Sequence, residues 1–251
     1  MKFKFTILTV VKNDKKKIEK TIKSVQEQTF KNFEYIVIDG NSNDGTFFKI
    51  KKLYSAKKFK IIRRKDISYY DSLNFGIKLS KGKFIGILNS GDKFVNKNIL
   101  KKIDSSLDKN TVIFYNNLVF KKQKKILRTW KHNVKKLDKS NIFKIPHSTL
   151  FLKKNIFKKV GLYNLKYKIS SDLDFIIRLS NHYNYVKHLN FNSIYMDYGG
   201  LSTSLKNYKL KLKEDFKILI NHFNLLFVVF YFLKIYFKFS DFKFKNFIKF
   251  K

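Results

Sequence analysis

An apolar run that ends on an aspartate is the first feature of this sequence that could carry chemistry. Residues 84–92 read Phe-Ile-Gly-Ile-Leu-Asn-Ser-Gly-Asp, and such a run is typical of an interior parallel strand. Ligands of open α/β sheets bind at the carboxyl ends of strands, where Asp92 could hold a hard divalent cation through oxygen. We interpret it as an anchor for a metal-diphosphate. The alternative is an ordinary exit from a strand, because Asn, Ser, Gly and Asp all favour turns.

A second acid, Asp39, ends an earlier predicted strand in the same way and is followed by turn residues. The patterns before Asp92 predict strands at 5–11, 33–39, 59–63 and 84–89, and helices at about 14–28, 46–56 and from residue 70. Strands that alternate with helices form right-handed parallel units, so both acids should reach the same edge of one sheet. Two carboxylates at one edge indicate a site, although either acid alone could be a helix cap.

The second half of the chain alternates less regularly. We predict a helix at about 96–107, antiparallel strands at 112–120 and 125–130, a strand at 148–152, and helices at 155–160 and 169–179. Asp172 and Asp174 lie in the first turn of the last helix, where acids commonly complement the helix dipole. Side chains two residues apart on a helix point about 200° from each other, so at most one of these acids can face a given pocket. His147, which follows the only proline, is by itself more typical of a structural residue.

Composition sets limits on the fold and its ligands. The chain has 251 residues, of which 44% are hydrophobic, enough for one large α/β core or two small ones. It has no cysteine, so a metal site must use oxygen or imidazole ligands. The first residues lack the apolar core of a secretory signal, and we expect the protein to stay in the cytoplasm.

The formal net charge is +37, and nearly all the cations are lysines spread over every segment. A field this positive attracts anions, which include nucleotides, lipid headgroups and nucleic acid. Only four of the cations are arginines, whereas proteins that read bases usually favour arginine. The charge therefore favours a phosphate ligand or a membrane surface without choosing between them.

The C-terminal segment has a composition of its own. Residues 225–233 are nine apolar residues without a break, and residues 234–251 interleave lysine with phenylalanine. A helix that spans a bilayer needs about 20 apolar residues, so this run is too short to cross one. Aromatic residues mixed with lysines suit the headgroup zone of an anionic leaflet. We predict membrane contact; the alternative is a helix packed on the domain followed by a disordered basic tail.

Several motifs, in order, resemble family 2 glycosyltransferases with the GT-A fold. They lie at residues 9–14, 22–46, 70–77, 88–92, 146–147, 171–174 and 199–202, so the resemblance covers roughly residues 3–204. It is to the branch that builds O-antigen, capsule and similar bacterial surface polysaccharides. The resemblance implies a Rossmann-like α/β fold with a mostly parallel sheet flanked by helices. We therefore expect a GT-A domain at residues 1–215. From its composition we expect residues 216–251 to form an aromatic, lysine-rich helical tail on the inner face of the cytoplasmic membrane.

The resemblance also implies the reaction. A sugar would move with inversion from a nucleotide-diphosphate donor, UDP- or dTDP-linked, to a hydroxyl of a lipid-linked or surface-glycan acceptor. The implied roles are Asp39 on the donor base, Thr9, Asn13, Asp71, Asn74 and Ser90 around the donor, Asp92 on Mn²⁺ or Mg²⁺, Asp172 as general base and His147 near the acceptor. A metal on the diphosphate neutralises the leaving group, while a carboxylate on the opposite face takes the acceptor proton.

The chain departs from the family pattern at four serines. Ser90-Gly91-Asp92 leaves one carboxylate in the metal motif, and Ser171 replaces the usual Glu before Asp172. Ser68 stands where Gly is usual before the Tyr-Asp pair, and Ser148 where Gln often follows the His. A nucleotidyltransferase of related fold would carry a Gly-rich loop near its N-terminus, and residues 9–14 contain no Gly. A basic nucleic-acid-binding protein without catalysis is the other alternative; it would be indifferent to alanine at Asp92, and we expect no nucleic-acid partner.

Overall fold

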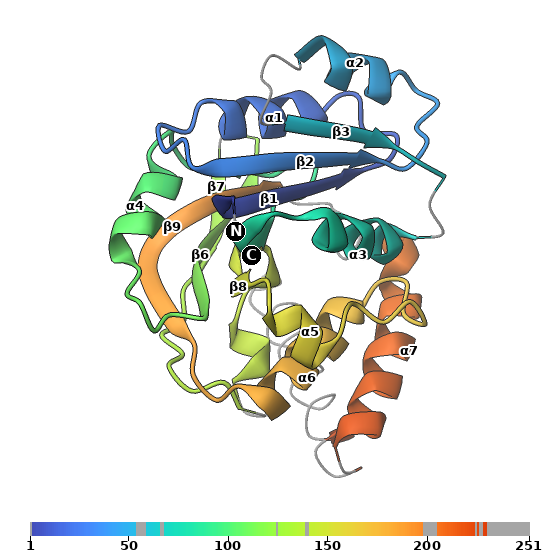
Figure 1. Cartoon of the computed structure of the whole chain (residues 1–251). Helices are drawn as coiled ribbons and strands as arrows, with labels where there is room; N and C mark the ends of the chain where they lie inside the picture. The colour runs from blue at the N-terminus through green and yellow to red at the C-terminus, as the bar shows by residue number, and fades with distance from the viewer. Residues whose placement is uncertain are drawn as a thin grey trace, which may run out of the picture.

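The computed structural model describes residues 2–53, 59–65, 68–123, 125–138, 141–197, 205–223, 225, 228 and 229. These residues form one nine-stranded sheet in the order β3-β2-β1-β4-β8-β6-β9-β5, with β7 paired to β6 (Figure 1). The strands are β1 (Phe3–Val11), β2 (Phe33–Asp39), β3 (Phe59–Arg63), β4 (Gly82–Ile87), β5 (Lys93–Phe94), β6 (Ile113–Lys122), β7 (Lys125–Trp130), β8 (Phe151–Lys153) and β9 (Lys187–Asp197). The mixed α/β class with a largely parallel first half is as predicted.

The first four strands in the order β3-β2-β1-β4 are all parallel. The apolar β-branched runs of β1, β2 and β4 are buried on both faces, which is the expected environment for interior parallel strands, whereas β3 at the edge of the sheet is partly exposed. The register places Val11 opposite Asp39, and Asp39 opposite Arg63. The predicted strands are confirmed, with two differences in their bounds: β1 begins two residues earlier, and β4 begins and ends two residues earlier. The residues from Leu88 to Asp92 therefore form a connection beyond the sheet edge.

Helices cover both faces of the sheet (Figure 1). One hydrophobic cluster joins the sheet to α1 (Ile18–Gln26), α2 (Thr46–Leu53) and α4 (Ile99–Ser106). A second joins it to α3 (Tyr69–Leu79), α5 (Ile156–Val160), α6 (Ser171–His182) and α7 (Leu205–His222). The helix predicted from residue 14 begins at Ile18, because Asp14 turns its side chain toward Ser90 instead of capping the helix.

The second half of the sheet is mostly antiparallel. The predicted hairpin of β6 and β7 is confirmed, and β8 pairs antiparallel with both β4 and β6. The predicted strand at 148–152 is shorter, because the 3₁₀ turns η1 (Ile142–Lys144) and η2 (His147–Thr149) occupy the preceding segment. Strands β9 and β5 were not predicted from the sequence, although β9 pairs along most of the length of β6.

One glycine allows β4 and β8 to approach. Gly86 and Phe151 are register partners, and a Cβ built on Gly86 would lie 2.3 Å from the Phe151 ring. Phe151 stacks on Phe114 with ring centroids 5.0 Å apart. The Phe151 ring therefore cannot move away from a larger side chain at position 86 without losing this stacking contact. Only glycine leaves space for this aromatic packing.

Helix α7 continues through the predicted domain boundary at residues 215 and 216. Ile218 and Leu219 are buried in the same cluster as α3 and α6, so the helix packs on the sheet domain on both sides of that boundary. The predicted boundary therefore falls within a single helix, and the division into a domain and a tail stays a prediction. Residues 230–251, including most of the predicted tail, and the motif at 199–202 lie outside the described residues.

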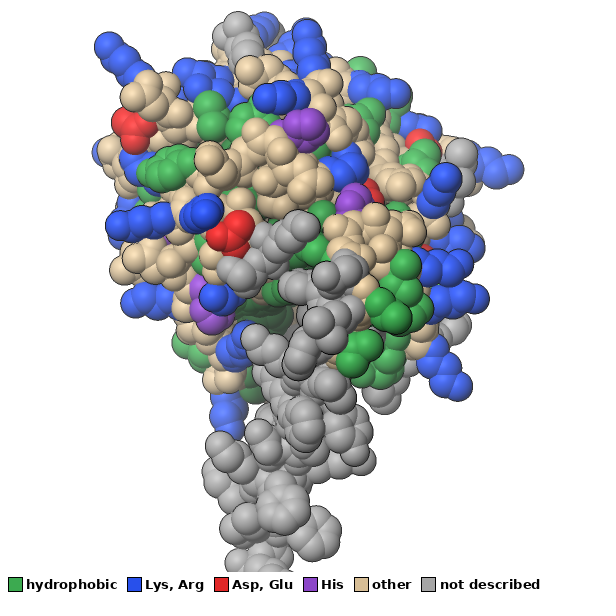
Figure 2. All heavy atoms as spheres, turned by 90° about the horizontal axis from the view of Figure 1, so that it is seen from below, with side chains coloured by type: hydrophobic (Ala, Val, Ile, Leu, Met, Phe, Trp, Pro, Cys, Tyr) green, Lys and Arg blue, Asp and Glu red, His purple; other side chains and the backbone are tan. Residues whose placement is uncertain are grey.

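No helix among the described residues has the length and apolar character needed to cross a membrane. Lysine and arginine side chains spread over the face seen from below, with few acidic side chains among them (Figure 2). This distribution agrees with the formal net charge of +37.

Candidate active site

Asp39 lies at the carboxyl end of β2, at the predicted edge of the sheet. Its side chain is fully buried, and its Oδ1 accepts a hydrogen bond of 2.9 Å from the Ser42 amide. The Arg63 Nε lies 3.7 Å from the same oxygen. The other oxygen, Oδ2, has no hydrogen-bond partner among the described residues. A buried carboxylate oxygen without a partner costs free energy, so this atom is suited to a ligand donor.

Asn13 fixes the loop after β1 against the loop after β2. Its backbone adopts a left-handed conformation with a φ of 52°, and its amide donates to the Ser42 hydroxyl at 2.9 Å. Its side-chain oxygen accepts from the Asn43 amide at 3.0 Å. Asn13 is exposed beside Asp39 and Ser42, as a residue at the edge of a binding site would be.

Asp71 begins α3 close to the same edge. Ser68 is the N-cap of α3, and its hydroxyl accepts from the Asp71 amide at 3.2 Å. Arg64 donates to the Asp71 carboxylate at 2.9 Å, and the Arg64 amide donates to the Asp39 carbonyl at 3.0 Å. Arg64 therefore connects two of the predicted donor residues, Asp39 through its backbone amide and Asp71 through its guanidinium.

The Thr9 and Asn74 side chains both bond within the fold, and their predicted role at the donor stays a prediction. The Thr9 hydroxyl is fully buried, 2.9 Å from the Tyr35 hydroxyl, and donates to the Leu88 carbonyl at 2.7 Å. The Asn74 side chain donates to the Tyr163 carbonyl at 2.8 Å and accepts from the Tyr163 amide at 2.9 Å. Both ends of the Asn74 amide thus bond the backbone of one residue, Tyr163, and these two bonds fix the orientation of the side chain.

The Ser90-Gly91-Asp92 turn is held by helix α1 and by the loop before it. The Ser90 hydroxyl donates to Asp14 at 2.6 Å, and Gly91 has a φ of 92°, which favours glycine. The Thr21 hydroxyl accepts from the Gly91 amide at 2.9 Å and donates to the Asp92 carbonyl at 2.7 Å. Ser90 therefore fixes the turn through Asp14, and its predicted contact with the donor stays a prediction.

The Asp92 carboxyl is 4% exposed, and burial raises its pKa to about 8. Hydrogen bonds from the Asn89 side chain and the Asp197 backbone oppose this shift, as does the Lys20 charge, whereas the Asp197 charge adds to it. Lys20 forms an ion pair with Asp197. Asp92 Oδ2 has no partner among the described residues. An orphaned oxygen on a buried acid fits a cation site.

Asp172 lies in a group of tyrosines at the start of α6. The Tyr70 hydroxyl donates to the Ile169 carbonyl at 2.7 Å and lies 3.3 Å from Asp172 Oδ1. His147 Nε2 lies 2.7 Å from the Tyr163 hydroxyl, and the rings of Tyr163 and Tyr70 are 5.5 Å apart. Burial lowers the pKa of His147, and the Asp172 charge opposes that shift. Asp172 and His147, 25 positions apart in the sequence, therefore share one environment.

Tyr69 connects the two carboxylates and was not predicted as a site residue. Its hydroxyl donates to the Asn89 side chain, which in turn interacts with Asp92. Burial raises the pKa of Tyr69 well above its usual range, and the charges of Asp172 and Asp92 raise it further. Tyr69 is therefore within electrostatic reach of both acids. The adjacent tyrosines at the start of α3 were the sequence signal that could have identified it.

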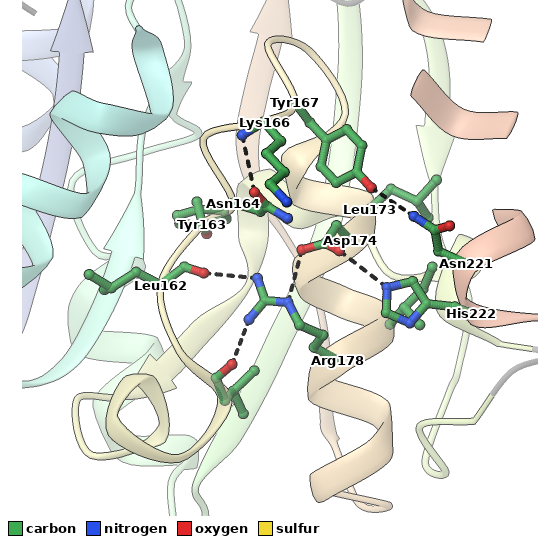
Figure 3. A network of polar contacts seen from close by, with 12 residues as sticks. Leu162, Tyr163, Asn164, Lys166, Tyr167, Leu173, Asp174, Arg178, Asn221 and His222 are labelled. Carbon is green, nitrogen blue, oxygen red and sulfur yellow. Dashed lines mark hydrogen bonds and ion pairs between the residues drawn. The ribbon is translucent and has the colours of Figure 1, made fainter. Parts of the chain in front are cut away.

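Asp174 points away from this group toward α7, as the helical spacing required of one of the two acids (Figure 3). Arg178 donates to Asp174 at 2.8 Å, and His222 Nε2 lies 3.2 Å from its other oxygen. Arg178 also donates to the Val160 and Leu162 carbonyls. Asp174 therefore joins α5, α6 and α7 and is a structural residue.

A sheet with acids at its parallel edge, faced by a tyrosine-lined carboxylate, defines an enzyme of the GT-A type. The family described as "Glycosyl transferase family 2" matches residues 6–168. The chain therefore belongs to glycosyl transferase family 2, and the protein is a glycosyltransferase.

Relatives and a solved structure agree with this assignment. The chain is 25% identical over 214 residues to the "PGL/p-HBAD biosynthesis glycosyltransferase" of Mycobacterium bovis, covering 80% of each protein. It is 28% identical over 117 residues to the Escherichia coli "UDP-Glc:alpha-D-GlcNAc-diphosphoundecaprenol beta-1,3-glucosyltransferase WfaP", covering 47% of each. The structure of S. aureus TarS 1-349 in complex with UDP-GlcNAc superposes with a TM-score of 0.72 at 18% identity, over 88% of this chain and 67% of that one. This likeness establishes the GT-A fold.

Proposed function

We propose that this glycosyltransferase moves a sugar from a UDP- or dTDP-linked donor to a hydroxyl of a lipid-linked or surface-glycan acceptor, with inversion. The observation that carries the proposal is that two adjacent tyrosines of α3 reach toward both acids. Tyr69 bonds the Asn89 side chain, which interacts with Asp92, and the Tyr70 hydroxyl lies 3.3 Å from Asp172 Oδ1. Asp92 belongs on the side of the leaving group and Asp172 on the side of the acceptor, so that the two acids serve a single displacement. Such a reaction needs a base but no enzymic nucleophile.

The donor nucleotide belongs at Asp39. Its orphaned Oδ2 can accept an N–H of the base, with Asn13 and Asp71 on either side of it. Arg63 lies beside Asp39 and packs on the Phe47 ring, 4.9 Å from its centroid, which fixes a cation at this edge. A uridine nucleotide is supported by the UDP-GlcNAc in the TarS complex and by the UDP-Glc in the name of WfaP.

A divalent cation, Mn²⁺ or Mg²⁺, fits at Asp92. The fit rests on the buried, unpartnered Oδ2, because carboxylate oxygens are ligands that hard cations prefer. Among the described residues no group of three or more His, Asp or Glu side chains converges, so other ligands would come from the donor or water. When bound, such an ion supplies charge neutralisation to the departing diphosphate.

Asp172 is the proposed base, and His147 the proposed acceptor-side residue. The Asp172 carboxylate would take the proton of the attacking hydroxyl. The lowered pKa of His147 keeps its imidazole neutral at pH 7, so it can bind a hydroxyl without adding a positive charge beside the sugar. The hydroxyls of Tyr70 and Tyr163 hold this group in place.

We propose that the acceptor lies at an anionic membrane surface on the cytoplasmic side. The name of WfaP supports a lipid-linked acceptor, because its substrate is linked to diphosphoundecaprenol. Phe216 and Ile220 of α7 are 44% and 42% exposed, and exposed Lys213 and Lys217 lie on the same helix face. A chain that ends at Val229 should lose binding to phosphatidylglycerol vesicles. Equal sedimentation of the truncated and full chains would refute contact through the tail.

The reaction is tested with a panel of UDP-glucose, UDP-GlcNAc, UDP-galactose and dTDP-glucose, with Mn²⁺ and release of the nucleoside diphosphate as the readout. Asp92→Ala should abolish the dependence on Mn²⁺ and nearly all turnover. Asp172→Asn should abolish turnover but keep donor binding. Asp104→Asn, a surface ion-pair residue far from the edge, is the matched control. Turnover retained by both site variants would refute the proposed mechanism.

A further inference from the structure

A buried glutamate of α7, Glu214, contacts the segment just before α6, the helix that carries Asp172. Glu214 is 6% exposed and accepts hydrogen bonds from three consecutive backbone amides. The distances are 2.8 Å from Lys168, 2.9 Å from Ile169 and 3.0 Å from Ser170. These residues directly precede α6. No sequence motif connects Glu214 with this segment, which lies 44 to 46 residues earlier in the chain.

The contact lies directly ahead of α6, at an N-cap that makes no side-chain capping bond. The first amides of a helix have no partner within it, and a Ser N-cap usually satisfies one of them. Ser170 is the N-cap of α6 but makes no side-chain capping bond. The Glu214 carboxylate accepts hydrogen bonds from the amides of residues 168–170, just before the helix. Its negative charge also interacts favourably with the positive end of the helix dipole. The path of residues 168–170 is therefore set by α7.

Tyr70 holds the same segment from the opposite side. Its hydroxyl donates to the Ile169 carbonyl at 2.7 Å and lies 3.4 Å from the Asp172 amide. Ile169 is thus bound through its N–H to Glu214 and through its C=O to Tyr70. Since Asp172 follows Ser170 by two residues on a rigid helical turn, these bonds set the position of its carboxylate.

A separate contact attaches α7 to α6 farther along. His222 Nε2 lies 3.2 Å from Asp174, whose other oxygen binds Arg178 (Figure 3). This contact docks the two helices but touches neither Asp172 nor the segment before it. The His222–Asp174 contact therefore serves as a control. One mutation can remove this contact between α7 and α6, and a different mutation can remove the Glu214 contact.

We propose that Glu214 is a positioning residue, which holds residues 168–170 so that Asp172 faces the acceptor. The inference rests on the proposed role of Asp172 as the base. The carboxylate itself does not touch the substrate. Its loss should displace the base and lower kcat, while the donor edge around Asp39 and Asp92 keeps its geometry and its KM.

The test is Glu214→Gln in the full chain, with release of UDP from UDP-GlcNAc or the best donor of the panel as the assay. Gln offers one acceptor oxygen where Glu offers two, and its NH₂ group faces amide donors. We expect kcat to fall at least tenfold and the donor KM to change less than twofold. Hydrogen exchange at the amides of residues 168–170 should accelerate at least tenfold.

His222→Ala is the matched control, because it removes the other α7–α6 contact. It should lower the melting temperature but leave kcat within twofold of wild type. A Glu214→Gln enzyme with wild-type kcat, or a fall in kcat equal to that of His222→Ala, would overturn the positioning role. Should Glu214→Gln fail to fold, Glu214→Asp, which keeps the charge on a shorter side chain, must show the same loss of kcat at unchanged KM.

Asp172→Asn is measured in parallel to separate the two proposals. If it loses turnover while Glu214→Gln keeps it, only the positioning role fails. If Asp172→Asn itself keeps wild-type turnover, the base assignment fails, and the positioning role fails with it.

Discussion

Replacing Asp92 by Asn should stabilise the metal-free protein, and the gain should grow as pH rises. The folded protein holds the Asp92 proton with a pKa of about 8, against an ordinary value of 3.8. Between these values the folded state binds a proton that the unfolded state has released. Stability therefore falls as pH rises through this window. Asn is uncharged at all these pH values and avoids the loss.

The magnitude follows from the width of the window. Each pH unit within it removes about 1.4 kcal/mol from the wild-type free energy of unfolding relative to the variant. From pH 5 to pH 7 the difference should therefore grow by about 3 kcal/mol, and it should level off above the folded pKa of about 8. Other titrating groups are common to both proteins and cancel in the difference.

The assay is unfolding in urea at pH 5, 6, 7 and 8 with EDTA, for wild type and Asp92→Asn. Asp108→Asn is the control, because a hydrogen bond from Lys187 holds the pKa of Asp108 far below the tested range. Its difference from wild type should not change with pH. Added Mn²⁺ should stabilise wild type but not Asp92→Asn, because only a ligand that binds the folded state shifts unfolding. A difference between Asp92→Asn and wild type that is constant from pH 5 to 8 would refute the reasoning.

Three further measurements probe the surrounding structure. Asn74→Ala leaves the buried N–H and C=O of Tyr163 without partners and should cost about 2–4 kcal/mol in urea unfolding; a cost below ~1 kcal/mol would contradict its structural role. Gly86→Ala should cost about 2 kcal/mol or more, with partial rescue in a double mutant with Phe151→Leu, and additive effects would contradict the contact. The imidazole of His147 should titrate by NMR below its ordinary pKa of 6.5 and lower still in Asp172→Asn, since the Asp172 charge raises that pKa; an upward shift in the variant would be inconsistent.

The donor edge could be predicted because its geometry follows from local sequence. Apolar runs define each strand, and the right-handed parallel connection fixes which end of each strand meets the others. Asp39 and Asp92 each end such a unit, so their common edge follows without any knowledge of distant contacts. The same reasoning could not tell a ligand-binding polar residue from one that binds the fold. Thr9 and Asn74 are examples, because their partners lie 79 and 89 residues away.

Strand β9 was missed because its apolar pattern is broken. Polar Asn190, Asn192 and Ser193 interrupt the run, and the pairing with β6 shifts register on either side of Asn117. The irregular pairing accommodates these residues through local β-bulges. A β-bulge breaks the strict alternation of apolar and polar residues by which a strand is recognised in a sequence. Without β9 the sequence also gave no reason to place Asp197 beside Asp92, although the Asp197 backbone contributes to the environment of that acid.

The two halves of the site therefore differ in how the chain specifies them. The donor edge comes from consecutive strand–helix units, whereas the surroundings of Asp172 depend on Tyr70, 102 residues earlier, and on Glu214, which binds the segment before α6. Contacts of this kind are set by packing and carry no periodic signal. A change in α7 can thus alter the placement of the base while the motifs around Asp39 and Asp92 stay intact. For this reason, a substitution in α7 can abolish sugar transfer even though every sequence motif of the family remains unchanged.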